Sequence, residues 1–395
     1  MNQLPQRFKP IDIFRAITML LMVFVNDLDP VKNVPEWIKH VEKNVDGLGF
    51  ADTIFPAFLF IVGLSLPFAI DSRIKKGQAA SRIATYILTR SFALLLMGFF
   101  HVNLENYNPS ALLPKPVWEI IITLAFFMVW LDYPAGMPPR KRYALQGAGI
   151  GLLLLMALLF KGGSVAHPVS LRTSWWGILG LIGWSYGLCG IVYLLSKGHR
   201  AVLLAAMAFF FLFNLAVHTD RVDELLDEKP FIWLVGNGAV PAFTMAGVIV
   251  SGLYTRFMGK GRQGAFFAIL LPAGMAMIAL GFLLRSFDGI SKLKGTPSWV
   301  GICTGISMLV FGGLVWLIDV KQQQAWFKII IPAGTSTLTC YLVPYLLYSV
   351  YKLVGFTYPA FLNEGAGGLI RSMLVALFAV VLTGWLEKRR IRLRI

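Results

Sequence analysis

Long apolar runs recur along this chain, and they constrain its fold more than any other feature. A helix needs about 20 mostly apolar residues to cross the hydrocarbon core of a bilayer, and these runs repeatedly approach or exceed that length. The pattern predicts an all-α fold, a polytopic transmembrane helical bundle of about 11–12 spans. The runs are 13–27, 53–71, 84–102, 116–132, 144–160, 175–196, 200–217, 237–255, 264–284, 299–318, 328–352 and 367–386.

The segments between these runs are short. No polar segment exceeds about 30 residues, so residues 1–395 are expected to form a single integral membrane domain. Residues 1–10 lead directly into the first run without the small-residue cleavage site of a signal peptide, so that run is expected to be a retained helix. We find no inverted repeat of the kind that secondary transporters carry.

The distribution of charge predicts an orientation. Of the 36 Lys and Arg residues, 23 fall in one alternating set of segments, with five acidic residues at or beside them. Positively charged loops stay in the cytoplasm, so both chain termini are expected to be cytoplasmic. The net charge of +16 then reflects topology and contact with anionic membrane lipids, and it does not indicate a nucleic acid partner. The C-terminal KRRIRLRI is expected to anchor the chain beside the membrane.

The cysteines and the common catalytic motifs are uninformative. Cys189, Cys303 and Cys340 lie in apolar runs without CxxC spacing, so neither a metal site nor a disulfide framework is expected. No HExxH or Walker loop occurs in the sequence.

Polar residues mark the ends of the first predicted span. Charged groups near bilayer depth cost a few kcal/mol each, so they tend to persist where they have a role. Asp12 and Arg15 are three residues apart on one helical face, where they either pair to orient the helix or lie near a bound anionic cofactor. Asn26, at the other end, is either a C-terminal cap or a donor to a carbonyl or oxyanion.

The loop 28–52 and the outer end of the third span supply candidate bases. A neutral imidazole such as that of His40 can accept a proton from an amine or hydroxyl, although a lone loop histidine is more often an ordinary surface residue. Asp52 opens the second span, as an N-cap or as the partner of a histidine or arginine. His101 clusters with Asn103 and Glu105 and is the second candidate base.

Two further clusters have alternative interpretations. The segment RSFDGISKLKGTPSW, residues 285–299, either binds an acidic or sugar-phosphate group through residues such as Lys292 or is a solvated loop. The segment PAGTSTLTCYLVPY carries a polar stripe suited to close helix packing or to lining a cavity.

These segments carry a family resemblance. IDIFRAITMLLMVFVND, a His-bearing loop and DGLGFADTIFPAFLFIVGLS together resemble the membrane acyltransferases related to heparan-α-glucosaminide N-acetyltransferase, especially bacterial relatives of unassigned substrate. The resemblance continues through HVNLENY, KLKGTPSW and WLIDV to GTSTLTCYLVPY. It implies a multi-pass protein of the bacterial cytoplasmic (inner) membrane that transfers an acetyl group from cytosolic acetyl-CoA to an amino sugar or glycan acceptor on the extracytoplasmic side.

The resemblance also implies roles for individual residues. His40 corresponds to the catalytic histidine of the family and Asn26 to its partner asparagine, with Asp52 supporting them. His40 would deprotonate the acceptor while Asn26 steadies the oxyanion, and the pantetheine arm of coenzyme A would thread between helices. Candidate cofactor-binding residues are Asp12, Arg15 and Ser65. Candidate acceptor-binding residues are His101, Asn103, Glu105, Lys292 and Trp299.

Other functional classes remain open from the sequence. Polysaccharide O-acyltransferases also begin with an Asp-x-x-Arg element, but their histidine typically lies inside the first span, where this chain has none. A secondary transporter of a small polar solute shares the number of spans, whereas the polar residues here crowd the outer ends of spans one to three. A lipid-scaffolding role is the third alternative. The resemblance also makes a homodimer an expectation.

Overall fold

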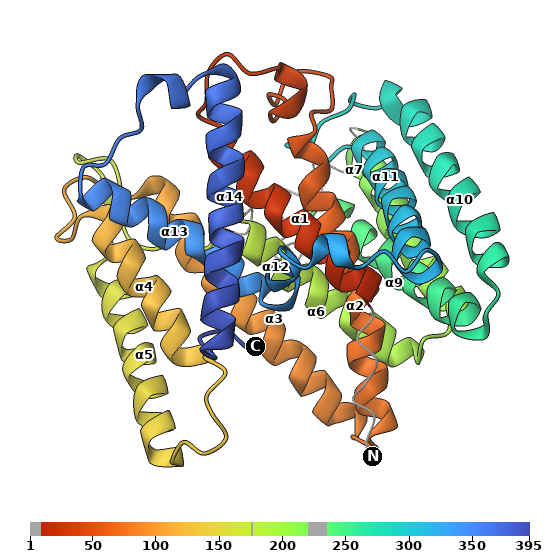
Figure 1. The fold of residues 1–395 in the computed structure, drawn as a ribbon, viewed down its shortest axis with the longest axis horizontal. Coiled ribbons are helices and arrows are strands. Elements are labelled where there is room, and N and C mark those ends of the chain that lie inside the picture. Colours follow the sequence, from red (N-terminus) through yellow and green to blue (C-terminus); the bar gives the residue numbers. More distant parts are fainter. Residues whose placement is uncertain (1–8, 175–176, 220–234) are drawn as a thin grey trace. The chain divides into compact units, whose positions relative to one another are not determined.

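The structure is a computed structural model that describes residues 9–174, 177–219 and 235–395 (Figure 1). Residues 1–8, the first two residues of the predicted span 175–196, and most of the predicted outer loop 218–236 lie outside this part. The longer helices are α1 (Lys9–Leu28), α2 (Ala51–Lys75), α3 (Ala80–Asn103), α4 (Lys115–Trp130), α5 (Pro139–Leu159), α6 (Ile178–Ser196), α7 (Arg200–Val217), α9 (Ala239–Phe257), α10 (Gln263–Leu283), α11 (Pro297–Val315), α13 (Thr337–Leu353) and α14 (Gly365–Lys388).

Short elements complete the secondary structure. They are α12 (Ile331–Thr335), η1 (Glu36–Ile38), η2 (Leu104–Asn106), η4 (Met258–Lys260), η5 (Leu284–Ser286), η6 (Trp316–Val320), η7 (Ala325–Phe327) and η8 (Ala360–Leu362). Within the described ranges, the named strands are β1 (Gly162–Gly163) and β2 (Pro168–Val169), which pair antiparallel. The predicted all-α class is confirmed.

Nine helices of the described part are long and apolar enough to cross a membrane, namely α2, α3, α5, α6, α7, α9, α10, α11 and α14. Large apolar side chains such as Leu158 and Leu283 are exposed on α5 and α10, as expected for helices that face lipid. The chain is therefore a multi-pass membrane protein. The predicted run 13–27 lies in α1, which is not among these nine helices. Every window of 18 residues in α1 contains three charged side chains, so α1 is less apolar than the nine.

Two predicted spans differ in length from the helices that form. The run 116–132 yields α4, which has 16 residues. The run 328–352 is interrupted at Ser336, whose φ of −126° and ψ of 48° lie outside the helical region and separate α12 from α13. The break falls among the small and polar residues 334–337, and apolar residues continue on both sides of it.

The chain divides into two compact units. Unit 1 comprises 1–18, 35–92 and 181–328, and unit 2 comprises 19–34, 93–180 and 329–395. Unit 1 contains the whole of α2, α7, α9, α10 and α11. Unit 2 contains the whole of α4, α5, α12, α13 and α14. Each unit is described below by itself.

In unit 1, α2 packs against α9, and α10 lies alongside α11 (Figure 1). Glycines allow the first contact, because a β-carbon on Gly63 would lie 1.8 Å from the carbonyl oxygen of Thr244. Reciprocally, a β-carbon on Gly247 would lie 2.0 Å from the carbonyl oxygen of Phe60. Small residues let helix backbones approach this closely in membrane proteins, so α2 is fixed against α9.

In unit 2, α4 lies between α5 and α13 in the packing, and the C-terminal segment folds back on the end of α4. The backbone N–H of Asp132 donates to the carbonyl of Arg392 at 2.9 Å, and the Arg392 side chain pairs with the Asp132 carboxylate at 2.9 Å. Arg394 also pairs with the Asp132 carboxylate, at 3.2 Å. Part of the basic C-terminal segment is thus bound by protein.

Candidate functional site

In unit 1, the loop residue His40 pairs with Asp52 at the start of α2. The Nδ1 atom of His40 lies 2.7 Å from Oδ1 of Asp52. The Asp52 side chain is 2% exposed and the His40 side chain 29% exposed. A partly exposed histidine that is held by a buried carboxylate has the arrangement of a general base with its orienting group.

Asp52 is held in place by several further contacts. Its Oδ2 accepts hydrogen bonds from the backbone N–H groups of Val41 at 3.0 Å and Gly49 at 3.1 Å. Its backbone carbonyl accepts one from Nε1 of Trp299 at 3.1 Å and lies 3.9 Å from Sγ of Cys303. A buried carboxylate persists when such donors replace water. Asp52 is therefore rigidly positioned beneath the imidazole.

Lys292 also approaches His40. Its Nζ lies 3.1 Å from Nδ1 of His40 and 3.8 Å from Oδ1 of Asp52. An ammonium only donates hydrogen bonds, so Nδ1 would have to be an unprotonated acceptor to bond with Lys292. When Nδ1 is protonated it donates to Asp52 instead, and Nε2 then carries the lone pair that can accept a proton. Lys292 and Asp52 thus compete for one ring nitrogen and set which edge of the imidazole is basic.

The loop that carries His40 is fastened to the loop that carries Lys292. The Asp46 carboxylate accepts hydrogen bonds from the backbone N–H of Ile290 at 2.7 Å and from Arg285 at 2.9 Å. These two contacts, the backbone one being larger, hold the pKa of Asp46 below its ordinary value of 3.8. Lys294 pairs with Asp288 at 2.6 Å, so much of the charge in residues 285–299 is neutralised by ion pairs.

The three candidate cofactor-binding residues also meet in unit 1. Arg15 pairs with Asp12 at 3.1 Å and donates to the hydroxyl of Ser65. Ser65 donates in turn to the carbonyl of Ile61 at 2.8 Å. Since Ser65 follows Asp52 on α2, the helical rise places it about 20 Å along the axis from Asp52. The cluster around Ser65 and the cluster around Asp52 thus lie at different positions along the axis of α2.

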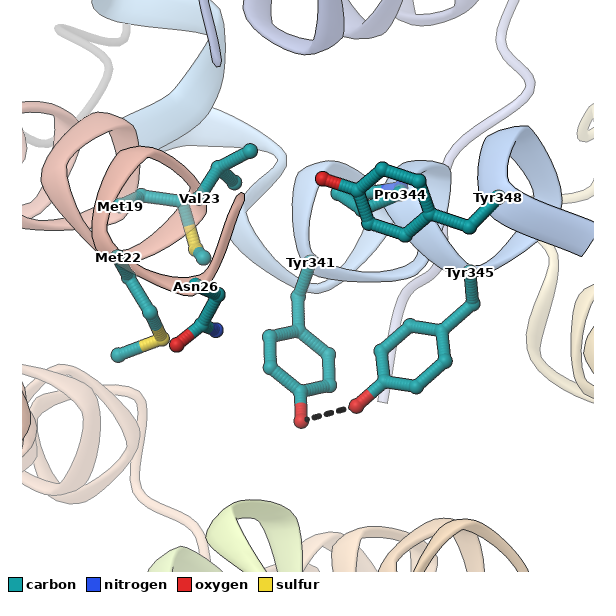
Figure 2. Close-up of a pocket in the computed structure, with 8 residues that line it drawn as sticks. All are labelled: Met19, Met22, Val23, Asn26, Tyr341, Pro344, Tyr345 and Tyr348. Atoms are coloured by element: carbon teal, nitrogen blue, oxygen red, sulfur yellow. Dashed lines mark hydrogen bonds between the residues drawn. The ribbon is translucent and has the colours of Figure 1, made fainter. Parts of the chain in front are cut away.

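In unit 2, Asn26 lines a cavity of about 210 Å³ together with residues of α1 and α13 (Figure 2). Asn26 is exposed, and its carboxamide forms no hydrogen bond with the described residues. The hydroxyls of Tyr341 and Tyr345 lie 2.9 Å apart. The cavity is lined by Met19, Met22, Val23, Asn26, Tyr341, Pro344, Tyr345 and Tyr348. It combines an apolar wall with a few polar groups, as small-molecule sites do.

A buried ion pair holds the end of α1 next to Asn26. Arg371 donates to Oδ2 of Asp27 at 3.2 Å and to its backbone carbonyl at 3.1 Å. Tyr348 donates to Oδ1 of Asp27 at 2.7 Å. The side chains of Arg371 and Asp27 are 8% and 5% exposed. This network fixes the residue that follows Asn26.

A second cavity of about 160 Å³ in unit 2 is lined by His101, Glu105, Tyr341 and Tyr345, among others. The His101 ring stacks on Tyr345 with centroids 4.3 Å apart, and its two nitrogens are buried without a hydrogen-bond partner in the described ranges. Asn103 lies differently, because its amide binds the backbone of Phe99 and Arg172. Asn103 thus holds the chain together locally.

The candidates therefore fall into two groups. Unit 1 brings together Asp12, Arg15 and Ser65 and, separately, His40, Asp52, Lys292 and Trp299. Unit 2 holds Asn26, His101, Asn103 and Glu105. Among the described residues, no group of three or more His, Cys, Asp or Glu side chains is placed to hold a metal ion.

Sequence comparison relates the N-terminal part of the chain to one family. Residues 7–102 match the family model described as heparan-alpha-glucosaminide N-acetyltransferase, catalytic. The chain is 38% identical over 108 residues to heparan-alpha-glucosaminide N-acetyltransferase of Homo sapiens, covering 27% of this chain and 15% of that protein. It is 36% identical over 140 residues to the Mus musculus protein of the same name, covering 32% of this chain and 20% of that protein. The matched stretch spans a fifth or less of these curated relatives.

The related stretch includes Asp12, Arg15, Asn26, His40, Asp52, Ser65 and His101. Asn103, Glu105, Lys292 and Trp299 lie beyond the family-model match. Residues 7–102 are thus related to this acetyltransferase family, and they contain both His40 and the carboxylate that orients it.

Proposed function

We propose that this protein is an acyltransferase of the bacterial inner membrane that moves an acetyl group from cytosolic acetyl-CoA to an amino sugar or glycan acceptor on the extracytoplasmic side. The observation that carries the proposal is the pair formed by His40 and the buried Asp52, 2.7 Å apart, within the stretch related to the N-acetyltransferases. Asymmetric basic loops support the orientation.

In this reaction His40 is the general base. With Nδ1–H donating to Asp52, Nε2 accepts the proton of the acceptor amine or hydroxyl as that group attacks the thioester carbonyl. A bond forms between the acceptor and the acyl carbon, the carbon–sulfur bond breaks, and the departing thiolate takes the proton back from the imidazolium. The Asp52 charge stabilises the imidazolium while it exists.

Lys292 influences the basicity of His40 and does not act on the acyl group. Its ammonium shares Asp52 with His40, so it helps to keep the carboxylate ionised. Trp299 is buried, and its indole N–H binds the first turn of α2. We therefore propose that Trp299 positions Asp52. Lys292, which lies beside His40, is proposed to border the acceptor site.

The remaining candidate residues are proposed to stabilise the oxyanion, bind the cofactor or bind the acceptor. The exposed carboxamide of Asn26 supports its role as the donor to the thioester oxyanion. Asn26 belongs to unit 2 and His40 to unit 1, so their action in one reaction stays a prediction. Asp12, Arg15 and Ser65 are proposed to bind the cofactor, and His101 and Glu105 the acceptor. The homodimer expected from the family is a further prediction.

The direct test is transfer of label by purified protein. Radiolabelled acetyl-CoA is incubated with a panel of amino sugars and hydroxyl-bearing envelope glycans, using wild type, His40→Ala and the control His167→Ala, whose histidine is exposed. We expect wild type and His167→Ala to transfer label and His40→Ala to be slower by about two to four orders of magnitude. Absence of transfer by wild type rejects the enzyme proposal, and full activity of His40→Ala rejects this base.

A further inference from the structure

A hollow in unit 1, where α2 ends and α3 begins, is rich in cationic groups. It has a volume of about 500 Å³ and is lined by Arg73, Ser81, Arg82, Thr85, Tyr86 and Thr89. Among the described residues, none that lines it is acidic. Asp12, Arg15, Ser65 and His40 are not among its lining residues, although Arg90, which contacts Tyr86, is close enough to Arg15 to repel it electrostatically.

The Arg73 side chain is held ready for a ligand. Its guanidinium carbon lies 3.4 Å from the centroid of the Tyr86 ring, and its Nη1 donates to Oε1 of Gln78 at 3.0 Å. The Tyr86 hydroxyl accepts from Nη1 of Arg90 at 2.6 Å. Stacking on an aromatic ring fixes the plane of a guanidinium at little further entropic cost. Tyr86 thus organises two arginines.

These arginines lack a carboxylate counter-charge in the described part of the chain. Arg73, Arg82 and Arg90 belong to none of the ion pairs found there. The carboxylate of Asp71, close in sequence, instead accepts from the hydroxyl of Tyr193, whose oxygen lies 3.0 and 3.1 Å from its two oxygens. The Nε atom of Arg90 is buried and has no hydrogen-bond partner among the described residues. The local charge therefore favours an anion.

The start of α3 adds to this preference. The helix begins at Ala80, so Ser81 and Arg82 lie in its first turn. Backbone N–H groups and the helix dipole give a helix N-terminus a partial positive charge, which favours phosphate. Planar guanidinium groups bind phosphate oxygens in a bidentate manner. Two arginines, a hydroxyl and a helix N-terminus together form a phosphate-type site.

We propose that the hollow lined by Arg73, Arg82 and Tyr86 binds a phosphate ester. Two sources supply this chemistry at a basic membrane surface: the 3′-phosphate of the coenzyme A nucleotide, and the phosphodiester of an anionic lipid. The nucleotide form rests on the proposed acetyl-CoA donor, and the lipid form does not. With either ligand, the exposed Arg82 contributes an accessible positive charge, and Arg73 contributes a guanidinium whose orientation is fixed by Tyr86.

The nucleotide arm uses full-length protein in phosphatidylcholine nanodiscs. Binding of adenosine 3′,5′-bisphosphate, acetyl-CoA and 3′-dephospho-acetyl-CoA is measured by calorimetry for wild type, Arg82→Ala and Arg73→Gln. The control is Arg140→Ala, an exposed arginine in the first turn of α5. We expect Arg82→Ala to weaken bisphosphate binding roughly tenfold and to abolish the preference for acetyl-CoA over its dephospho form, since one charge-assisted hydrogen bond accounts for that factor.

The lipid arm measures retention of phosphatidylglycerol by native mass spectrometry. A lipid ligand predicts that Arg82→Ala loses a bound phosphatidylglycerol that wild type and Arg140→Ala keep, while nucleotide affinity is unchanged. If Arg82→Ala and Arg73→Gln match wild type in both arms, the phosphate site is disproved. Both experiments measure binding and do not require acetyl transfer. If the wild-type protein proves inactive, the proposed function is rejected, but the phosphate site is still tested.

Discussion

Gly49 lies against the backbone of Lys39, so closely that a β-carbon on Gly49 would stand 1.9 Å from the Lys39 carbonyl oxygen. This contact brings the end of the loop 28–52 against the residue that precedes His40. The N–H of Gly49 also binds Asp52 at 3.1 Å. One position without a side chain thus sets the separation between the base and its orienting carboxylate.

Gly49→Ala is expected to lower acetyl transfer roughly a hundredfold, because a displacement of about 1 Å at a catalytic group has effects of that order. The matched control is Gly47→Ala, whose β-carbon would lie at an ordinary 3.6 Å from Val41. Turnover and the circular dichroism melting curve are compared for both variants. Equal turnover in the two variants would show that the Gly49 contact does not position His40.

Asp52→Asn is expected to reduce turnover by about two to four orders of magnitude while the protein remains folded. The amide oxygen can still accept from Val41 and Gly49, but the amide nitrogen then donates to Nδ1 of His40. That reversal places the ring proton on Nε2 and removes the basic edge. Turnover is measured beside Asp46→Asn, which changes a carboxylate of the same loop that does not touch His40. The orienting role of Asp52 is refuted if Asp52→Asn retains wild-type turnover.

Asn26→Ala is expected to lower turnover by roughly two to three orders of magnitude, the effect of removing one oxyanion donor. Its melting temperature should match wild type, because the exposed carboxamide bonds to no described residue. Asn26→Asp is the companion variant, since it keeps the size and removes the donor. Unchanged turnover in both variants would remove Asn26 from the mechanism.

Arg371→Met is expected to destabilise the protein by about 3–5 kcal/mol, because it leaves the buried Asp27 carboxylate without its cation. The double variant Asp27→Asn/Arg371→Met removes that uncompensated charge, so it should recover part of the loss. Denaturation in detergent is followed for the two variants and for Arg140→Ala, which is exposed. A double variant less stable than Arg371→Met would contradict the buried-pair explanation.

The contact between the loops of His40 and Lys292 is expected to weaken in acid. The folded-state pKa of Asp46 lies below its ordinary value, so its stabilising contribution is complete above about pH 3.8 and is lost as the pH falls through the folded value. Hydrogen exchange of the peptide containing Ile290, corrected for intrinsic rates, should show this loss of protection in wild type. Asp46→Asn should show little change over the same range; a pH response equal to wild type would place its origin elsewhere.

The sequence allowed most of the helices to be predicted, because an apolar run of about 20 residues has few alternatives in a membrane protein. It also indicated that Asp52 can partner a histidine. The break at Ser336 falls among the small and polar residues 334–337, but such a polar stripe does not by itself specify two non-helical backbone angles. Lys292 was predicted to contact an anionic ligand, whereas its proximity to His40 depends on a loop more than 240 residues away in sequence.

The tyrosine wall of the Asn26 cavity was missed although a signal was present. Tyr341, Tyr345 and Tyr348 recur at intervals of four and three residues, which places them on one face of α13. The threonine stripe before them has a different role, since Thr339 accepts a hydrogen bond from the backbone of Leu393 at 3.0 Å. A glycine such as Gly49 gives no sign from sequence alone that its missing side chain matters.

The paired glycines of α2 and α9 limit where a substrate can travel within unit 1. Gly63 and Gly247 leave no room for even a methyl group between the two backbones. A pantetheine arm is wider than that space, so it cannot pass through this seam. Any route along α2 from the position of Ser65 to that of Asp52 must therefore follow a different face of the helix.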